Sequence, residues 1–122
     1  MENLPAARTE HLFSYGTLQQ PEVQLAIFGR LLDSRPDRLP GYRLGLLAID
    51  DAQVVAASRK THHPIAARGD AADGVPGAVL AMSLEELRQA DGYEVADYRR
   101  ERVTLASGLQ AWAYVDARDA LA

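Results

Sequence analysis

The strongest constraint on this chain is residues 11–18, where an apolar strand gives way to a glycine turn just before a helix. Leu12, Phe13 and Tyr15 favour a strand, and Gly16 permits a tight turn or a close approach of the backbone to a ligand. A strand, a turn and a helix start in succession leave several N–H groups pointing one way, which is a common means of holding a carboxylate or an oxyanion. An ordinary first strand and loop is the simpler alternative.

Length and composition exclude several classes of protein. The 122 residues suffice for one domain, so we expect residues 1–122 to form a single domain, with residues 1–10 and 116–122 frayed. The net charge is -4 and the basic residues are scattered, which argues against nucleic acid or an anionic membrane as a partner. The absence of cysteine excludes disulfides, a thiol nucleophile and thiolate metal sites.

We expect a cytoplasmic protein of unknown oligomeric state. No apolar run approaches the roughly 18 residues that a membrane-spanning helix requires. Residues 1–10 lack the hydrophobic core of a signal peptide.

Two helices are predicted from periodicity and capping. Residues 21–32 begin with a proline that suits a first helical turn, and Gly29 stands near their end. The apolar residues expected on the buried face of this helix recur at helical spacing: Val23, Ala26, Ile27 and Leu31. Ser83 and Glu86 match a capping box, and Gly92 stands where the helix that they open should end. This second helix is expected to bury three residues: Leu84, Leu87 and Ala90.

The remaining chain predicts several short strands. These are expected at residues 41–49, 54–58, 75–82, 98–105 and 109–115. Residues 33–40 are charged and contain two prolines, so they predict a loop. Residues 59–73 predict a long surface loop with one short strand around Ile65. Many strands with only two helices indicate an α+β domain with a curled or barrel-like sheet.

Glu94 is the candidate acid for catalysis. It follows the expected end of a helix and stands between Tyr93 and Val95, which can keep it dry. A carboxyl in such a pocket is harder to ionise and better matched to proton transfer near neutral pH. The Tyr98 hydroxyl can reach the same cavity, although a tyrosine at this place is commonly a core residue with its oxygen at the rim. A solvated surface glutamate is the alternative for Glu94.

Other candidates for chemistry find less support. His62 and His63 invite a metal hypothesis, but adjacent residues in an extended segment point to opposite sides and no further cluster supports them. We therefore expect no metal site. None of the serines has the context of a nucleophile elbow, and Ser83 is explained as a cap. Trp112 is expected to pack rather than to stack on bases.

Residues 12–18 and 91–99 together resemble the γ-glutamylcyclotransferase-like family, which includes γ-glutamylamine cyclotransferases. Residues 12–18 carry a Tyr-Gly-Thr-Leu turn after the first strand, and residues 91–99 carry an acidic residue, a glutamate and a following tyrosine. The resemblance spans roughly residues 11–115. It implies a small mixed β-barrel with flanking helices.

The resemblance also implies a reaction: release of an amine from a γ- or ε-linked glutamyl group as 5-oxoproline forms. The substrate's own α-amine would be the nucleophile, so we expect no cofactor. Glu94 would move the protons, and the backbone N–H groups of Gly16, Thr17 and Leu18 would hold the substrate carboxylate or the oxyanion. Tyr15 and Tyr98 would line the pocket.

Two departures from the family pattern leave the substrate open. Residues 19–21 replace a glycine that many members carry after the turn, and Val95 stands where a glycine often follows the catalytic glutamate. A non-catalytic small-molecule binding module of the same fold is one alternative. A structural or interaction protein is another, and it would have an occluded cavity at Gly16 and a solvent-facing Glu94.

Overall fold

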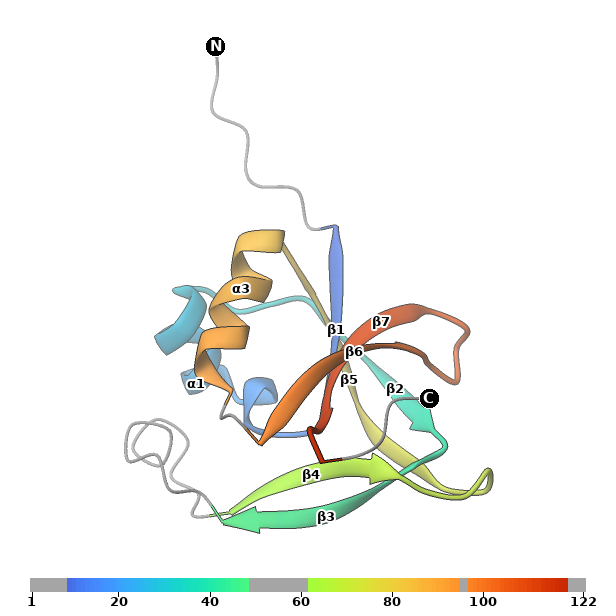
Figure 1. The fold of residues 1–122 in the computed structure, drawn as a ribbon. Coiled ribbons are helices and arrows are strands. Elements are labelled where there is room, and N and C mark those ends of the chain that lie inside the picture. The colour runs from blue at the N-terminus through green and yellow to red at the C-terminus, as the bar shows by residue number, and fades with distance from the viewer. Residues whose placement is uncertain (1–8, 49–61, 95–96, 119–122) are drawn as a thin grey trace.

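The computed structural model describes residues 9–48, 62–94 and 97–118, and over these ranges it has an α+β fold, as predicted (Figure 1). The strands in chain order are β1 (Glu10–Ser14), β2 (Ser34–Pro40), β3 (Tyr42–Ala48), β4 (His62–Arg68), β5 (Gly74–Met82), β6 (Tyr98–Thr104) and β7 (Gln110–Asp116). The helices are the short 3-10 turn η1 (Thr17–Gln19), α1 (Pro21–Phe28) and α3 (Leu84–Tyr93). No helix in the described ranges is long and apolar enough to span a bilayer.

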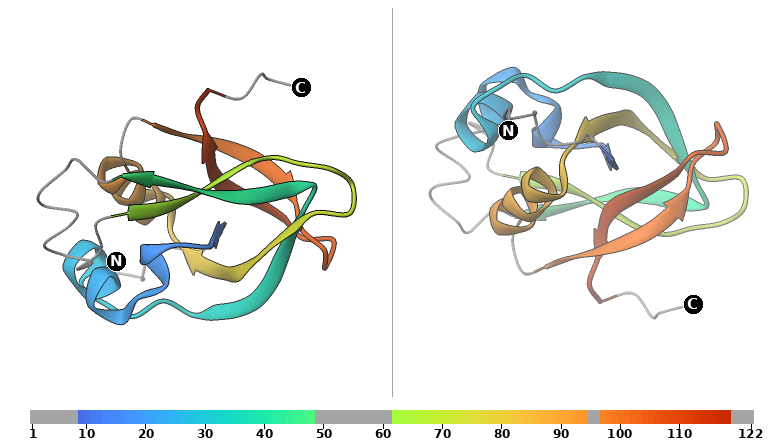
Figure 2. Two further views of the ribbon diagram at one scale, coloured as in Figure 1. Left: turned by 90° about the horizontal axis from the view of Figure 1, so that it is seen from below. Right: turned by 90° about the horizontal axis from the view of Figure 1, so that it is seen from above.

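Strand β1 lies in the middle of the larger sheet. Its five strands have the order β2-β5-β1-β7-β6, and β1 pairs antiparallel with β5 and parallel with β7. Strands β3 and β4 form a separate antiparallel hairpin that lies across the larger sheet (Figure 2). In the described part of the chain the two sheets share no strand pairing, so the predicted barrel is not closed.

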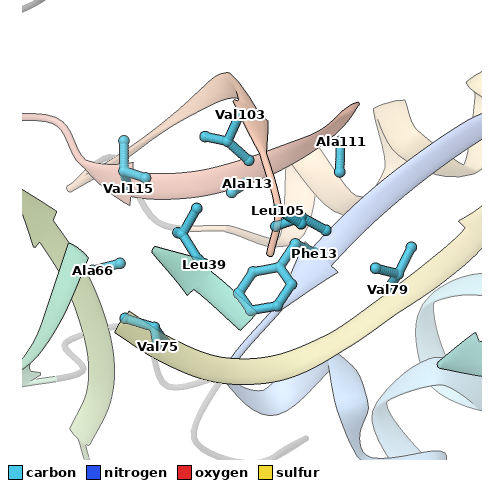
Figure 3. Packing of buried hydrophobic residues seen from close by; sticks show 10 residues of the cluster. All are labelled: Phe13, Leu39, Ala66, Val75, Val79, Val103, Leu105, Ala111, Ala113 and Val115. Atoms are coloured by element: carbon cyan, nitrogen blue, oxygen red, sulfur yellow. The ribbon is translucent and has the colours of Figure 1, made fainter. Parts of the chain in front are cut away.

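The two faces of the larger sheet bury different hydrophobic clusters because side chains alternate along each strand. On β1, Leu12 packs with the helices in one cluster, here called the helix-side cluster, which includes Val23 and Leu87. Phe13 packs toward the β3–β4 hairpin in the other, the hairpin-side cluster, where its ring lies among the other buried side chains (Figure 3). Strand β7 alternates in the same way, with Ala113 in the hairpin-side cluster and Tyr114 in the helix-side cluster. One end of β1 is therefore held between a helical layer and the hairpin.

Helix α1 is shorter than predicted. It ends at Phe28 because Gly29 adopts the left-handed conformation, with φ of 71°. The expected buried residues Ala26 and Leu31 are exposed, Leu31 at 57%. Gln24 is buried instead, where its amide donates to the Leu18 carbonyl at 2.8 Å and accepts from the Leu32 N–H at 3.0 Å. A satisfied polar side chain thus replaces part of the expected apolar face.

The capping box of α3 is confirmed. The Glu86 N–H donates to Ser83 Oγ at 3.1 Å, and the Ser83 N–H donates to Glu86 Oε1 at 3.0 Å. Of the expected buried residues, Leu87 and Ala90 are buried but Leu84 is 47% exposed. The helix continues through Gly92 to Tyr93, so the prediction that Gly92 ends it is wrong.

Two predicted loops contain strands. Residues 34–40 of the first predicted loop form the edge strand β2, which within the described ranges pairs with β5 alone. An edge strand tolerates proline because one of its sides needs no ladder hydrogen bonds. Strand β4 occupies much of the loop predicted at residues 59–73 and includes the short strand expected around Ile65. The predicted strands at residues 75–82, 98–105 and 109–115 are confirmed, whereas the strand at 54–58 lies outside the described residues.

The chain termini differ in part from the predicted frayed segments. Glu10 belongs to β1, and Asp116 ends β7 with only 5% of its surface exposed. Residues 1–8 and 119–122 lie outside the described residues.

Two glycines provide a matched test of this packing. A Cβ at Gly77 would lie 2.4 Å from the Ser14 carbonyl oxygen and 2.7 Å from Phe13 Cζ, whereas one at Gly92 has no neighbour within 4 Å. We predict that Gly77→Ala lowers the free energy of unfolding by about 1–3 kcal/mol. Gly92→Ala should leave it unchanged or raise it by up to about 1 kcal/mol. Urea unfolding of both variants checks this, and equal midpoints would contradict the close contact of β5 with β1.

Candidate active site

A pocket opens where β1 ends. It is lined by residues from β1, the turn before η1, the start of η1, β4, the C-cap of α3 and the start of β6: Ser14, Tyr15, Gly16, Thr17, Pro64, Glu94 and Tyr98. The empty space, including the open mouth, is about 290 Å³. Residues from distant parts of the sequence therefore line one pocket.

The turn after β1 presents bare backbone to this pocket. Gly16 is not left-handed, and a Cβ there would meet the Pro64 ring at 3.6 Å, so the glycine keeps a slot open rather than relieving strain. The Gly16 N–H donates to Ser14 Oγ over a long 3.4 Å. Within the described ranges, the amides of Thr17 and Leu18 at the start of η1 have no backbone acceptor.

Leu18 differs from the other residues predicted for the site. Its side chain is 2% exposed and packs in the helix-side cluster, and the residue is not part of the pocket lining. The predicted role of Leu18 thus depends on its amide alone. Thr17 lines the pocket, and its hydroxyl lies 2.8 Å from the Tyr93 hydroxyl, which ties η1 to the end of α3.

Glu94 caps the C-terminal end of α3 and reaches into the pocket. Its N–H donates to the Ala90 carbonyl at 3.1 Å, which fixes the backbone from which the carboxyl projects. Burial raises the pKa of Glu94 to about 8, and the nearby Asp91 carboxylate acts in the same direction. At neutral pH the side chain is therefore mostly protonated when the pocket is empty.

The two tyrosines of the pocket hold the β3–β4 hairpin against the larger sheet. The Tyr15 hydroxyl donates to the Tyr114 carbonyl and accepts from the Ala66 N–H at 3.0 Å. The Tyr98 hydroxyl donates to the Pro64 carbonyl at 2.7 Å. Burial raises the pKa of both hydroxyls, so they remain neutral donors. Their rings and hydrogen bonds shape the pocket. Both hydroxyl protons are donated to backbone carbonyls, so neither hydroxyl is available for proton transfer.

Sequence reasoning missed two residues of the lining. Ser14 is buried and follows a known local pattern in which a serine hydroxyl bonds a backbone N–H two residues on, so the motif could have indicated it. Pro64 comes from a segment predicted as loop, and no local signal places it opposite Gly16.

The metal hypothesis receives no support from the described residues, which contain no cluster of three His, Cys, Asp or Glu side chains. The backbone of His62 and His63 belongs to β4, and their side chains lie outside what the structure describes. Val95, a departure from the family pattern, also lies outside the described residues.

Comparison with known proteins adds family and fold. The family model described as "Gamma-glutamyl cyclotransferase, AIG2-like" matches residues 12–121. The solution structure of At3g28950.1 from Arabidopsis thaliana is similar, with a TM-score of 0.68, 26% identity and 88% of this chain covered; the chain spans 61% of that protein. No curated protein matches the chain.

Two more distant structures share the fold. At5g39720.1 from Arabidopsis thaliana has a TM-score of 0.72 and 20% identity, covering 96% of this chain and 74% of its own. The uncharacterized protein PH0828 from Pyrococcus horikoshii has a TM-score of 0.61 and 18% identity. The match covers 88% of this chain and 78% of that protein.

The raised pKa of Glu94 predicts a pH-dependent cost to stability. The folded state binds a proton that the unfolded state releases near pH 4.3, so stability should fall as pH rises from that value to about 8. Glu94→Gln stays neutral and escapes this loss. We predict that the free energy of unfolding of Glu94→Gln minus that of the original chain is larger at pH 8.5 than at pH 6.0 by at least about 1 kcal/mol.

Urea unfolding of the two proteins at both pH values measures this gain. Glu85→Gln is the matched control, because Glu85 is an exposed glutamate on the same helix and its removal should change stability by about 0.5 kcal/mol or less at either pH. A Glu94→Gln effect independent of pH would show that the carboxyl is solvated.

Proposed function

Because the chain belongs to the AIG2-like γ-glutamyl cyclotransferase family, we propose that it cleaves a γ- or ε-linked glutamyl compound, releasing an amine and forming 5-oxoproline. The observation that carries the proposal is the pocket in which the Glu94 carboxyl and the Tyr15–Gly16–Thr17 turn meet. This combination supplies a proton carrier and backbone donors on walls of the same cavity.

The reaction suits a pocket without a nucleophilic side chain. The substrate's α-amine attacks its own γ-carbonyl, so the protein has only to fold the substrate until the two groups meet. Such orientation can contribute about 7–11 kcal/mol in well-arranged intramolecular reactions. The close approach of Pro64 to Gly16 supports this role, because it narrows the pocket that a flexible glutamyl chain would enter.

Glu94 is proposed as the general base and then the general acid. It accepts a proton from the substrate ammonium, and the freed amine attacks the γ-carbon to form the new C–N bond. Glu94 gives this proton to the departing nitrogen as its bond to the γ-carbon breaks, and the ring nitrogen loses its second proton to the same amine, which leaves as an ammonium. A carboxyl with a pKa of about 8 is close in acidity to an amino-acid ammonium, so proton transfer has a low energetic cost in both directions.

The turn after β1 is proposed to bind negative charge. The amides of Gly16, Thr17 and Leu18 would donate to the substrate carboxylate or to the oxygen that becomes negative during attack. The Gly16 amide supports this assignment, because its 3.4 Å bond to Ser14 is weak and can be exchanged for a better acceptor. Tyr15 and Tyr98 would close the sides of the pocket.

We predict that Glu94→Gln lowers kcat for 5-oxoproline release by about 10²–10⁴-fold, because the amide cannot carry the proton. The assay should cover γ-glutamyl amino acids, γ-glutamyl amines and ε-linked glutamyl-lysine, with Glu85→Gln as the active control. Full activity in Glu94→Gln would exclude the shuttle. Saturable binding of 5-oxoproline without turnover of any substrate would instead favour a binding module.

The pH dependence of the reaction provides an independent prediction. Since the carboxylate form accepts the proton, kcat/KM should rise with pH along a limb centred near pH 8, the pKa of Glu94 in the free protein. Initial rates at low substrate concentration between pH 5 and pH 9 measure this limb. A limb centred near pH 4.3, the ordinary value for glutamate, would contradict the buried carboxyl.

A further inference from the structure

A second carboxylate stands one helical turn before Glu94. Asp91 and Glu94 are three residues apart at the end of α3, a spacing that puts them on the same side of a helix. We propose that Asp91, held in place by Tyr114 and Arg100, is a positioning residue that controls when Glu94 can give up and accept a proton. Its catalytic meaning rests on the proposed function, but its effect on Glu94 can be measured without turnover.

Two groups from the larger sheet fix Asp91. The Tyr114 hydroxyl on β7 donates to Asp91 Oδ1 at 2.6 Å, and Arg100 Nε on β6 contacts the same oxygen at 3.1 Å. Tyr114 is only 7% exposed, and burial together with the bond to Asp91 raises the pKa of its hydroxyl, so it remains a donor. A short bond from a buried donor and an ion pair define the position of the carboxylate.

Arg100 is itself held by an aromatic ring. Its guanidinium lies 4.5 Å from the centre of the Trp112 ring, whose indole N–H donates to Glu10 Oε1 at 3.1 Å. Arg102 lies over the same ring at 4.9 Å but has no bond to Asp91. Two arginines therefore lie over the Trp112 ring, the half-buried Arg100, which touches Asp91, and the exposed Arg102.

Within the described residues, Asp91 is the charged group that acts on Glu94. The other titratable groups facing Glu94 are Tyr15 on β1, Tyr98 on β6 and Tyr114 on β7, and burial keeps all three neutral. Asp91 disfavours a second negative charge at Glu94. Arg100 pairs with Asp91, so we expect its positive charge to offset part of that effect. Because the side chains of Arg100 and Asp91 are 26% and 37% exposed, salt should weaken the coupling.

This arrangement gives the pocket a ligand-dependent charge. When it is empty, burial and the fixed Asp91 carboxylate together keep Glu94 protonated. A ligand ammonium in the pocket would compensate the charge of Glu94 and allow it to ionise. Arg100 limits the effect, since without it Glu94 would hold its proton too firmly.

Carboxyl-carbon NMR of the full chain, titrated without ligand, tests the coupling. Asp91→Asn should lower the titration midpoint of Glu94 by about one pH unit, and Arg100→Met should raise it. Arg102→Met, which keeps Asp91 and its partners, should leave it unchanged. Unchanged midpoints in Asp91→Asn and Arg100→Met, or shifts in the same direction, would overturn the proposal.

Two further measurements separate coupling from structural damage. Tyr114→Phe keeps the Asp91 charge but removes its anchor, and it should make the Glu94 midpoint more sensitive to added salt as Asp91 becomes more solvated. In the 5-oxoproline assay, the acid limb should move in the same directions as the NMR midpoints. NMR shifts without 5-oxoproline release would reject the proposed function and leave the coupling supported.

Discussion

The site depends on the hydroxyl of Tyr15, which bonds both sheets. The five-stranded sheet and the β3–β4 hairpin share no strand pairing in the described ranges, yet the hairpin covers buried backbone groups that require partners. Tyr15 supplies them by donating to the Tyr114 carbonyl on β7 and accepting from the Ala66 N–H on β4. A second bond, from the Tyr98 hydroxyl to the Pro64 carbonyl, fixes the hairpin at a residue that lines the pocket. The wall opposite Gly16 is therefore placed by side chains of the other sheet.

The same burial determines which groups of the pocket ionise. It raises the pKa of Tyr15 and Tyr98, which keeps their hydroxyls protonated and their structural bonds intact. It also raises the pKa of Glu94 into the neutral range, at a cost to folding that a solvated carboxyl would avoid. A position that weakens stability and suits proton transfer is typical of functional sites, where local rules of good folding are broken.

Local patterns predicted the features that depend on neighbours in sequence. The capping box at Ser83 and the strand leading into Gly16 needed only a few adjacent residues to be identified. Strand β2 could not be predicted this way, because β5 pairs with a charged, proline-containing segment that no periodicity identifies. Pro64 is similar, since tertiary bonds alone bring it to the pocket. Glu94 was found from a motif, but its burial comes from packing.

A protonated glutamate and a general base are at first sight incompatible. At neutral pH the empty pocket holds mostly the acid form of Glu94, which is a poor proton acceptor. In the proposed reaction the ligand removes this obstacle, because its ammonium stabilises the carboxylate that must form beside it. A neutral ligand gains no such stabilisation and meets only a hydrogen-bond donor. If the proposed reaction holds, the energetic penalty of burying Glu94 becomes selectivity for a cationic amine, and the Tyr15 bonds that hold the hairpin over the pocket contribute to that selectivity.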